Sequence, residues 1–423
     1  MPCLSRRSFL ATSAAVAATP ALGALRPSDR LDVAVIGAGA AGIAAGRRFA
    51  AAKRSFVIVE AVDRVGGRCL TDTEIFGVPY DLGAHWIHMP DLNPVSKLAA
   101  STGLNVYSAP PGERVRIGRR YARPGEMEDF LSALVRSNRA ISEQARGKVD
   151  VPCAQALPKD LLDWRSTVGF VLGPFGCGKD LTEVSAVDFA KSVERDVDAF
   201  CRQGFGALIA NLAEGLPIQL SNPVKRIEYS RRGVEIATAK GYINARTAII
   251  TASTGVLAAD KIKFDPDLPN RYLEAANKLA LGSYDHIALE LPGNPLGLQR
   301  DDLLFEKADS SRTGAILGNI AGTPLTMVDV GGTFGRELSA QGAEAMVDFA
   351  VNWLGNLYGA DLKKAVKRSH ATRWNDEPWT LGAFSVASVG GQGSRRVLME
   401  PVRERLWFAG EAAHETLWGT VGG

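Results

Sequence analysis

Three glycines and one carboxylate near the N-terminus have residue types and a spacing that suit the binding of phosphate groups. Gly37, Gly39 and Gly42 form the turn GAGAAG, which follows the apolar run LDVAVI and precedes a helix-forming stretch. In such a turn the first glycine permits the bend, the second lets the backbone approach a pyrophosphate, and the third lets the helix pack on the strand. A second strand ends at Glu60, whose carboxylate is placed to accept hydrogen bonds from ribose hydroxyls. Strand, turn, helix and acid in this order predict a dinucleotide site.

The residues that follow this acid distinguish NAD from FAD. Segment 61–68 (AVDRVGGR) continues the acidic strand end into a two-glycine turn flanked by Arg64 and Arg68. Far downstream, another apolar strand ends in Gly410 and Glu411 (LWFAGE). Both segments resemble the extended fingerprint of FAD-dependent amine oxidases. The resemblance implies that Arg68 reaches the cofactor phosphates, that Arg64 supports the same region, and that Glu411 binds the ribityl chain of the flavin.

Further segments resemble the same family, in order, from about residue 31 to residue 423. DLGAHWIH (81–88) is similar to the stretch that passes along the flavin, and IQLSNPVKRIEY (218–229) to the strand that touches adenosine. Ala383 stands where monoamine oxidases have the cysteine that bonds to flavin, so the resemblance implies noncovalent FAD. The cofactor contacts implied by motif and resemblance are Gly37, Gly39, Ala40, Ala41, Gly42, Glu60, Arg64, Gly67, Arg68, Gly83, Ala84, His85, Trp86, Val224, Trp374, Gly410, Glu411, Thr420 and Val421.

Two histidines and two aromatic residues are candidates for contact with a substrate amine. His85 or His88 could bind a substrate nitrogen or adjust its protonation, because an imidazole titrates near pH 6.5. The alternative, that both only hydrogen-bond loop backbone, stays open. Phe384 matches the family's aromatic position beside the substrate nitrogen. Thr420 occupies the place of the second cage tyrosine of monoamine oxidases, and Trp418 is a candidate to replace that wall.

A third histidine marks a departure from the family pattern. Most of these oxidases have a lysine on a strand of the substrate domain, linked through water to flavin N5. In the matching strand, 283–289 (SYDHIAL), His286 takes the place of the lysine. It could hold a water and shuttle protons, or signal altered oxygen reactivity, a different electron acceptor or weak catalysis. It could also be a strand-end histidine that faces solvent.

The resemblance implies oxidation of an amine, with a polyamine or another extended amine as the expected substrate class. Hydride would leave the carbon next to the amine for flavin N5, the imine would hydrolyse to a carbonyl, and O2 would accept the electrons to form H2O2. An aromatic pocket would help by favouring the neutral amine. Two alternatives stay open: a flavin dehydrogenase or desaturase of a hydrophobic substrate, and a flavin-binding chain with degenerate catalysis.

Another glycine-rich segment imitates a nucleotide-hydrolase motif. Segment 173–179 (GPFGCGK) has the P-loop spacing, but Asp180 replaces the hydroxyl residue that binds magnesium, and Pro174 removes a backbone donor. We therefore reject a P-loop. The net charge of +3 comes from scattered residues, which favours no nucleic-acid partner, and the cysteine spacing fits no zinc site, so no metal is expected.

The first two dozen residues have the features of an export signal. SRRSFL (5–10) precedes an Ala-rich, moderately apolar stretch, which resembles a bacterial twin-arginine signal. We expect residues 1–24 to be removed and the protein to use the twin-arginine export machinery, with a periplasmic or otherwise exported location. That route carries folded proteins and so suits a tightly bound flavin. No later stretch offers about 20 uninterrupted apolar residues, so no stable membrane span is expected.

These segments require two domains that share one chain in pieces. We expect a Rossmann-like α/β FAD-binding domain (GR2-type flavoprotein) assembled from residues 30–105, 205–262 and 395–423. Residues 106–204 and 263–394 would form an α+β substrate domain of mixed sheet and helices. The family continues beyond VGG (421–423) into a helix that faces the flavin, so we expect either a truncated sequence or another element in its place.

Overall fold

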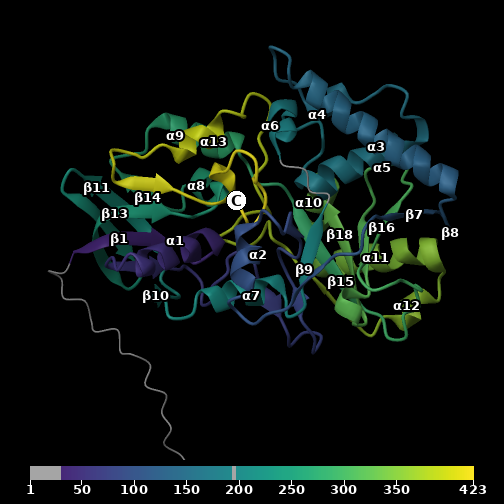
Figure 1. Ribbon diagram of the computed structural model, residues 1–423, viewed down its shortest axis with the longest axis horizontal. Coiled ribbons are helices and arrows are strands. Elements are labelled where there is room, and N and C mark those ends of the chain that lie inside the picture. Colours follow the sequence, from purple (N-terminus) through teal and green to yellow (C-terminus); the bar gives the residue numbers. More distant parts are fainter. Residues whose placement is uncertain (1–29, 193–196) are drawn as a thin grey trace, which may run out of the picture.

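The computed structural model describes residues 30–192 and 197–423, and its elements gather around two large sheets (Figure 1). The first sheet has the order β10-β2-β1-β13-β12-β11-β14, and β20 pairs in parallel with β13. Its central strands are parallel, as a dinucleotide-binding sheet requires. The strands are β1 (Leu31–Ile36), β2 (Phe56–Val59), β10 (Ile218–Gln219), β11 (Val224–Ser230), β12 (Gly233–Thr238), β13 (Gly241–Ile250), β14 (Lys263–Asp265) and β20 (Leu406–Phe408).

Alternate side chains of β1 enter two different cores, because successive residues of a strand point to opposite faces. Val33 and Val35 pack beneath α1 (Ala40–Ala51), whereas Ala34 and Ile36 belong to the core on the other face. Three helices contribute to that second core: α8 (Thr254–Ala258), α9 (Asn270–Lys278) and α13 (Ser394–Met399). The parallel sheet is thus covered on both faces, and the GAGAAG turn is fixed between β1 and α1.

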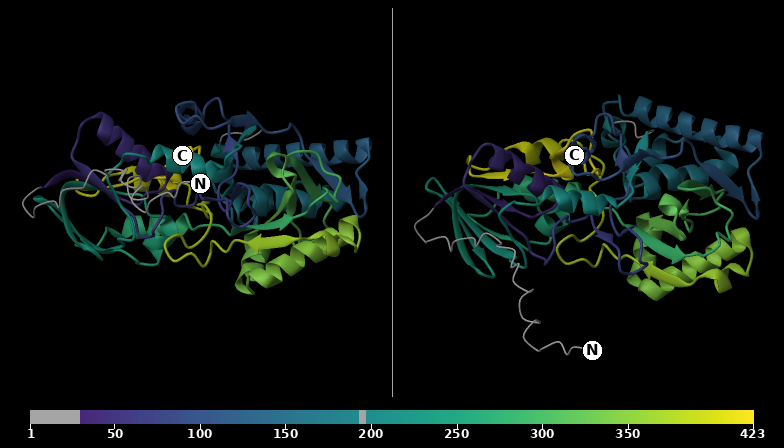
Figure 2. Two further views of the ribbon diagram at one scale, coloured as in Figure 1. Left: turned by 90° about the horizontal axis from the view of Figure 1, so that it is seen from below. Right: turned by 60° about the horizontal axis from the view of Figure 1, so that its bottom comes forward.

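The second sheet has the order β19-β15-β18-β17-β16-β7-β8. Its helices lie on its two sides, with α3 and α5 on one side and α11 and α12 on the other (Figure 2). Neighbouring residues of β16, Leu304 and Phe305, divide between these two cores. The elements are β7 (Arg114–Ile117), β8 (Arg120–Tyr121), β15 (Tyr284–Glu290), β16 (Asp302–Glu306), β17 (Ala315–Gly318), β18 (Leu325–Gly331), β19 (Arg368–Ala371), α3 (Pro124–Gln144), α5 (Arg165–Phe170), α10 (Gly332–Ala340), α11 (Ala343–Tyr358) and α12 (Leu362–Ala365).

Short elements complete the fold and carry much of the site. A small sheet, β5-β9-β6, joins segments from three parts of the chain, and a π-helical turn, η2, follows α5. The C-terminus lies between the two large sheets (Figure 1). These elements are β3 (Thr71–Asp72), β4 (Tyr80–Asp81), β5 (Ile87–His88), β6 (Val106–Ser108), β9 (Asp198–Cys201), α2 (Pro94–Ala99), α4 (Cys153–Ala156), α6 (Ala186–Lys191), α7 (Phe205–Leu212), η1 (Leu162–Trp164), η2 (Val171–Phe175), η3 (Ile320–Gly322) and η4 (Glu411–Ala413).

The predicted first strand is confirmed as β1, and the chain continues to pair with the first sheet beyond residue 262. The expected FAD-binding segment ends at residue 262, yet β14 pairs with β11 just beyond it. Tyr272 and Ala275 of α9 are also buried in the core of the first sheet. The pairing and packing of residues 263–279 therefore place them with the first sheet, because an apolar helix face follows the core that it covers.

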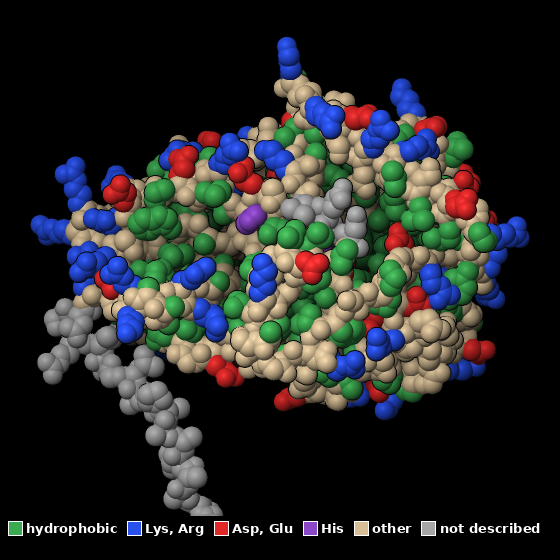
Figure 3. Space-filling model, in the orientation of Figure 1, with side chains coloured by type: hydrophobic (Ala, Val, Ile, Leu, Met, Phe, Trp, Pro, Cys, Tyr) green, Lys and Arg blue, Asp and Glu red, His purple; other side chains and the backbone are tan. Residues whose placement is uncertain are grey.

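The surface and the cysteines bear on the remaining expectations. Lys and Arg side chains are scattered over the face in Figure 3, with acidic side chains between them. Within residues 30–192 and 197–423, no helix combines the length and apolar character that crossing a membrane requires. The four cysteines there are free and buried, and no cluster of side chains in those ranges could hold a metal ion.

Candidate functional site

The glycine turn is shaped for a ligand that approaches its backbone. Gly37 has φ +104°, and a Cβ on Gly42 would lie 1.9 Å from the carbonyl oxygen of Gly37. Neither position can accept a side chain without movement of the backbone. A Cβ on Gly39, by contrast, would meet no protein atom closer than 3.9 Å. Gly39 lines a cavity of about 640 Å³, so the open space beside it belongs to the site.

Glu60 lies at the end of β2 and holds this turn in place. Its carboxylate accepts hydrogen bonds from the backbone N–H of Ala38 (2.7 Å) and of Val62 (3.1 Å). The side chain is 8% exposed and lines the cavity. The carboxylate therefore ties the glycine turn to the second strand and is also available to a ribose at the cavity wall.

The two-glycine turn lies directly against the first one. Gly66 donates its N–H to the carbonyl of Ala38, and a Cβ on Gly67 would lie 3.2 Å from the Cα of Gly39. Arg64 donates to the carbonyl of Gly67 at 2.8 Å. Two segments that are separate in the sequence thus form one continuous backbone cradle.

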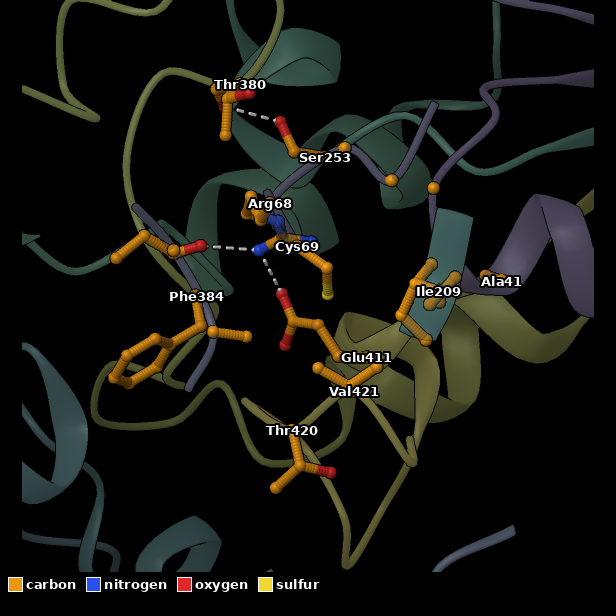
Figure 4. A pocket seen from close by; sticks show the side chains of 18 of the residues that line it. Ala41, Arg68, Cys69, Ile209, Ser253, Thr380, Phe384, Glu411, Thr420 and Val421 are labelled. Carbon is orange, nitrogen blue, oxygen red and sulfur yellow. Dashed lines mark hydrogen bonds and ion pairs between the residues drawn. The ribbon is translucent and has the colours of Figure 1, made fainter. Parts of the chain in front are cut away.

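Arg68 and Glu411 join the two ends of the FAD-binding sequence. Nη1 of Arg68 lies 2.9 Å from Oε1 of Glu411 and donates to the carbonyl of Ala383 at 2.6 Å. Figure 4 shows the guanidinium reaching the carboxylate, with Thr420 and Val421 beyond it. The other carboxylate oxygen accepts from the hydroxyl of Ser385 (2.7 Å). Burial raises the pKa of a carboxyl, but Arg68 and Ser385 outweigh it and hold the pKa of Glu411 below its ordinary value.

The loop between β4 and β5 contributes His85, which is buried, and Trp86, which is half-buried, to the cavity. Nδ1 of His85 is hydrogen-bonded to a carboxylate oxygen of Asp81 at 2.8 Å. The imidazole ring stacks on the ring of Phe200, with the two ring centroids 4.7 Å apart. The outer nitrogen of His85, Nε2, and Nε1 of Trp86 are both buried without a hydrogen-bond partner in the described part of the chain. Both residues line the cavity, but these two atoms lie beneath its surface.

His88 lies in the same cavity but differs from His85 in its surroundings. Its Nδ1 is 2.6 Å from a carboxylate oxygen of Asp198 in the neighbouring strand β9. Both side chains are partly exposed and line the cavity. His88 is therefore bonded to a side chain, and not only to loop backbone as the alternative interpretation held.

His286 is buried and has both ring nitrogens occupied. Nδ1 lies 2.6 Å from Asp329, and Nε2 lies 2.8 Å from the carbonyl oxygen of Gly83. Burial disfavours the charged ring, but Asp329 and the Gly83 carbonyl outweigh it and raise the pKa of His286 to about 9. The imidazolium thus holds the loop that contains Gly83 in place by donating to the carbonyl of Gly83. With 4% of its surface exposed, His286 does not face solvent, which corrects that alternative.

Three aromatic rings from separate elements form another wall of the cavity. The Tyr284 ring centroid lies 5.9 Å from that of Phe384 and 6.2 Å from that of Phe175. The hydroxyl of Tyr284 donates to Asp329 at 2.9 Å. Burial, reinforced by that carboxylate, raises the pKa of Tyr284 well above its ordinary value, so the phenol stays neutral. Phe384 therefore lies in an aromatic cluster, at the place where the family has an aromatic beside the amine.

Nearly all of the predicted residues line this one cavity. Trp374 lines it too, and its indole N–H donates to the carbonyl of Leu82 at 2.7 Å. Gly42 does not line the cavity, because its role is the close contact of helix and turn described above. Trp418 does not line it either: it is 1% exposed and packs in a core under the guanidinium of Arg395. The prediction that Trp418 forms a wall of the cavity is therefore wrong.

The cavity fits FAD by the criteria that a protein structure offers. The open cradle beside Gly39, the carboxylate of Glu60 and the paired side chains of Arg68 and Glu411 all line this one cavity. The sequence model of the family described as "Flavin containing amine oxidoreductase" matches residues 40–195 and 164–423.

The chain belongs to this family. FAD is its cofactor. A model of the twin-arginine translocation pathway signal matches residues 3–23, which supports export across a membrane. That signal lies outside the described residues.

Individual relatives of this amine oxidoreductase are distant in sequence. It is 26% identical to lysine-specific histone demethylase 2 of Homo sapiens over 94% of the chain, and 27% identical to polyamine oxidase 3 of Oryza sativa subsp. japonica over 94%. The chain spans 53% of the demethylase and 87% of the polyamine oxidase. The chain therefore covers only about half, or less, of the length of three histone demethylases among its relatives.

Solved structures show the same fold. The chain matches cyclohexylamine oxidase from Brevibacterium oxydans with a TM-score of 0.79 and 21% identity, covering 93% of this chain and 96% of the other. It matches a putrescine oxidase bound to putrescine with the same TM-score, 19% identity and the same coverage. These structures support the two-domain architecture of a flavin-dependent amine oxidase.

Several site residues were not predicted from the sequence. Ser385 and Asp329 act behind the cavity surface, through Glu411 and His286 respectively, and neither was given a role from the sequence. Phe175 lies in the rejected P-loop sequence, whose first three residues belong instead to the π-helical turn η2. Such turns are frequent at functional sites, but no sequence pattern announces one.

Proposed function

We propose that the protein is an FAD-dependent amine oxidase that converts an amine to an imine, with O2 as electron acceptor and H2O2 as product. The observation that carries this proposal is the continuity of one cavity from the glycine cradle to the aromatic cluster of Phe175, Tyr284 and Phe384. A dinucleotide and a small amine could share that space. The names of the relatives, which include polyamine, putrescine and cyclohexylamine oxidases, agree with this class of reaction.

FAD would be held by the glycine cradle, Glu60, Arg68 and Glu411, and it would accept a hydride from the carbon next to the amine nitrogen. Ala383 carries no group that could bond to flavin, so we propose noncovalent binding. The Arg68 and Glu411 pair joins the first and last of the FAD-binding segments, and each of these two charges has the other as its partner.

The side chains of the cavity prepare the amine. An aliphatic amine in water is mostly protonated, and its lone pair is then unavailable. The aromatic rings of Phe384, Tyr284 and Phe175 offer little solvation to an ammonium ion, which lowers the pKa of a bound amine. The neutral amine can release a hydride from its carbon. The imine is then hydrolysed by water to an aldehyde or ketone.

The state of His286 favours a second candidate function. Both nitrogens of its ring are bonded, to Asp329 and to Gly83, so neither is free to hold a water in the cavity. The resemblance implies that the family lysine in this place acts through such a water. A dehydrogenase that passes electrons to an acceptor other than O2 would share every other feature of the site.

One experiment distinguishes these possibilities. The purified holoprotein is mixed without oxygen with monoamines, polyamines and amino acids, and the flavin absorbance is followed. We expect bleaching with amines and, after air is admitted, one H2O2 for each amine consumed. Bleaching without peroxide would identify the dehydrogenase. Absence of bleaching with every amine would contradict amine oxidation and favour flavin binding without turnover.

A further inference from the structure

One end of the cavity is lined by apolar side chains of the substrate domain. They come from the π-helical turn η2, from β15 and β16, and from the segment before α13. We call this the apolar end; its residues are Val171, Leu172, Phe175, Tyr284, Leu303 and Phe384.

The apolar end is the inner surface of a core and not a loose group of side chains. Leu172 is 8% exposed and belongs to the core between α3 and the second sheet, and Phe175 and Phe384 pack against that core. Behind Phe175, the ring of Phe305 lies at 5.1 Å in an edge-to-face arrangement. Close-packed rings of this kind fix the wall in one conformation and leave no room for water behind it.

The ionisable groups at this end are already neutralised. The hydroxyl of Tyr284 stays protonated and donates a hydrogen bond to Asp329. Asp329 is 1% exposed and is also paired with His286, whose second nitrogen is bonded to backbone. Among the described residues of the apolar end, no charge is therefore left to bind an ammonium group.

The carboxylates of the cavity lie elsewhere. Glu60 and Glu411 belong to the FAD-binding segments, and Glu377 is an exposed residue. Asp198 is bonded to His88 in the small sheet β5-β9-β6. Asp198 and Glu377 are thus the described carboxylates of the cavity outside the FAD-binding segments, and Asp198, whose side chain is 19% exposed, is the better shielded of the two as an ammonium site.

We propose that the apolar end binds the hydrocarbon body of a monoamine, alkyl or aryl, and excludes a second ammonium group. The inference rests on the proposed amine oxidation and narrows its substrate class. Burial of methylene or ring carbons against these side chains favours binding. A second ammonium would lose its hydration there without gaining a partner, which opposes binding. The sequence analysis expected a polyamine or another extended amine as substrate. This inference excludes the polyamine and keeps the extended amine with a single amino group.

The test compares two amines of one chain length, hexylamine and hexamethylenediamine, with the holoprotein. The rate of anaerobic flavin bleaching at low amine concentration is measured for each. We expect hexylamine to be faster by about 10-fold or more, the scale of discrimination by a hydrophobic pocket. Equal rates, or a faster diamine, would overturn the inference while leaving amine oxidation standing.

A binding measurement keeps the two proposals separable. Cumylamine has no hydrogen on the carbon next to its nitrogen, so it can bind without being oxidised. We expect it to perturb the flavin absorbance and to protect the flavin from bleaching by hexylamine. If cumylamine binds and no amine bleaches the flavin, the substrate-class inference stands and the proposed oxidation fails. If hexylamine bleaches the flavin but cumylamine does not compete, the apolar end is not the binding site.

Three variants test the electrostatic reason. Leu303→Glu places a carboxylate at the apolar end, and Leu303→Gln is its neutral control of the same size. We expect the preference for hexylamine to shrink by about 10-fold in Leu303→Glu relative to Leu303→Gln. In Asp198→Asn, the ratio of the bleaching rate with hexylamine to that with hexamethylenediamine should stay within about threefold of the wild-type ratio. Selective loss of diamine oxidation in Asp198→Asn would overturn the inference, because it would identify a second ammonium site.

Discussion

At the dinucleotide end of the cavity the contacts are made by backbone and by charged side chains, whereas the apolar end is made of aromatic and aliphatic side chains. Gly37, Gly39 and Glu60 come from one short stretch of sequence, between β1 and the end of β2. Phe175 and Tyr284 come from elements more than a hundred residues apart, yet their rings lie at 6.2 Å. One end is a local motif, and the other is a product of the tertiary fold.

This difference separates what each end contributes. Changes at the dinucleotide end should cause loss of FAD, because we propose that the backbone cradle and the pair of Arg68 and Glu411 hold that cofactor. Changes at the apolar end should leave FAD in place and alter the oxidation of amines. His286 lies at the junction, because it is a buried residue of β15 in the second sheet and is bonded to the carbonyl of Gly83.

The largest effect is expected for Gly42→Ala. The added Cβ would lie 1.9 Å from the Gly37 carbonyl oxygen, so the helix must move off the turn. We expect a loss of about 3 kcal/mol in the free energy of unfolding, the upper part of the range for overpacking, and a protein purified without FAD. The flavin-to-protein absorbance ratio and urea unfolding measure both. Gly355→Ala in α11, where a Cβ meets nothing within 4 Å, should keep its FAD and serves as the control.

The second effect is a pH dependence of stability that originates at His286. Its pKa is raised to about 9 in the folded protein, so its contribution is complete below the unfolded pKa near 6.5 and is lost as pH rises through about 9. A shift of this size corresponds to about 3 kcal/mol. We expect the unfolding free energy of the wild type to fall relative to that of His286→Gln across this window, measured by urea unfolding of the holoprotein.

A matched control for that window is His370→Gln on the neighbouring strand β19. Burial lowers the pKa of His370, so its titration lies below the window and the pH slope above about 6.5 should match the wild type. An unchanged slope in His286→Gln would show that His286 is not an imidazolium in the folded protein.

The third effect concerns the pair that closes the FAD-binding segments. Glu411→Gln leaves Arg68 without its carboxylate and weakens the bonds from Ser385. We expect FAD to bind about 10-fold more weakly, which is about 1.4 kcal/mol. Fluorescence titration of the apoprotein with FAD measures this. Glu400→Gln, which breaks an exposed pair with Arg271, should leave the affinity unchanged; an equal loss in both variants would contradict the role of Glu411.

The smallest effect is expected at the apolar end. Phe384→Leu removes one ring from the aromatic cluster while the FAD contacts remain. We expect an unchanged FAD content and a fall of about 10-fold in kcat/KM for hydrophobic amines. Phe349→Leu in α11, away from the cavity, is the control for a general effect of losing a ring. Loss of FAD from Phe384→Leu would contradict the claim that the apolar end acts on amine oxidation and not on FAD binding.

The dinucleotide end could be predicted from the sequence because its parts are local. The turn residues and Glu60 lie between the end of β1 and the residue that follows β2, and β1 has the predicted bounds. Arg68 was predicted by resemblance, and so was Glu411. Its partner Ser385 was not predicted, because the hydrogen bond depends on how two distant segments meet.

The apolar end and the histidines were harder to predict for the same reason. The sequence indicated the strand that carries His286, but not its hydrogen bonds to Asp329 and Gly83. These bonds form only when the second sheet packs against the loop that contains Gly83. The prediction for Trp418 failed because the sequence does not show whether a tryptophan in this loop points into the cavity or into the core. Here it points into the core, beneath Arg395.

The most direct test of amine oxidation is anaerobic mixing of the purified holoprotein with hexylamine. We expect the flavin absorbance to bleach fully, and to return with stoichiometric H2O2 when air is admitted. A flavin that stays oxidised with hexylamine and with every other amine tried would contradict the proposed function.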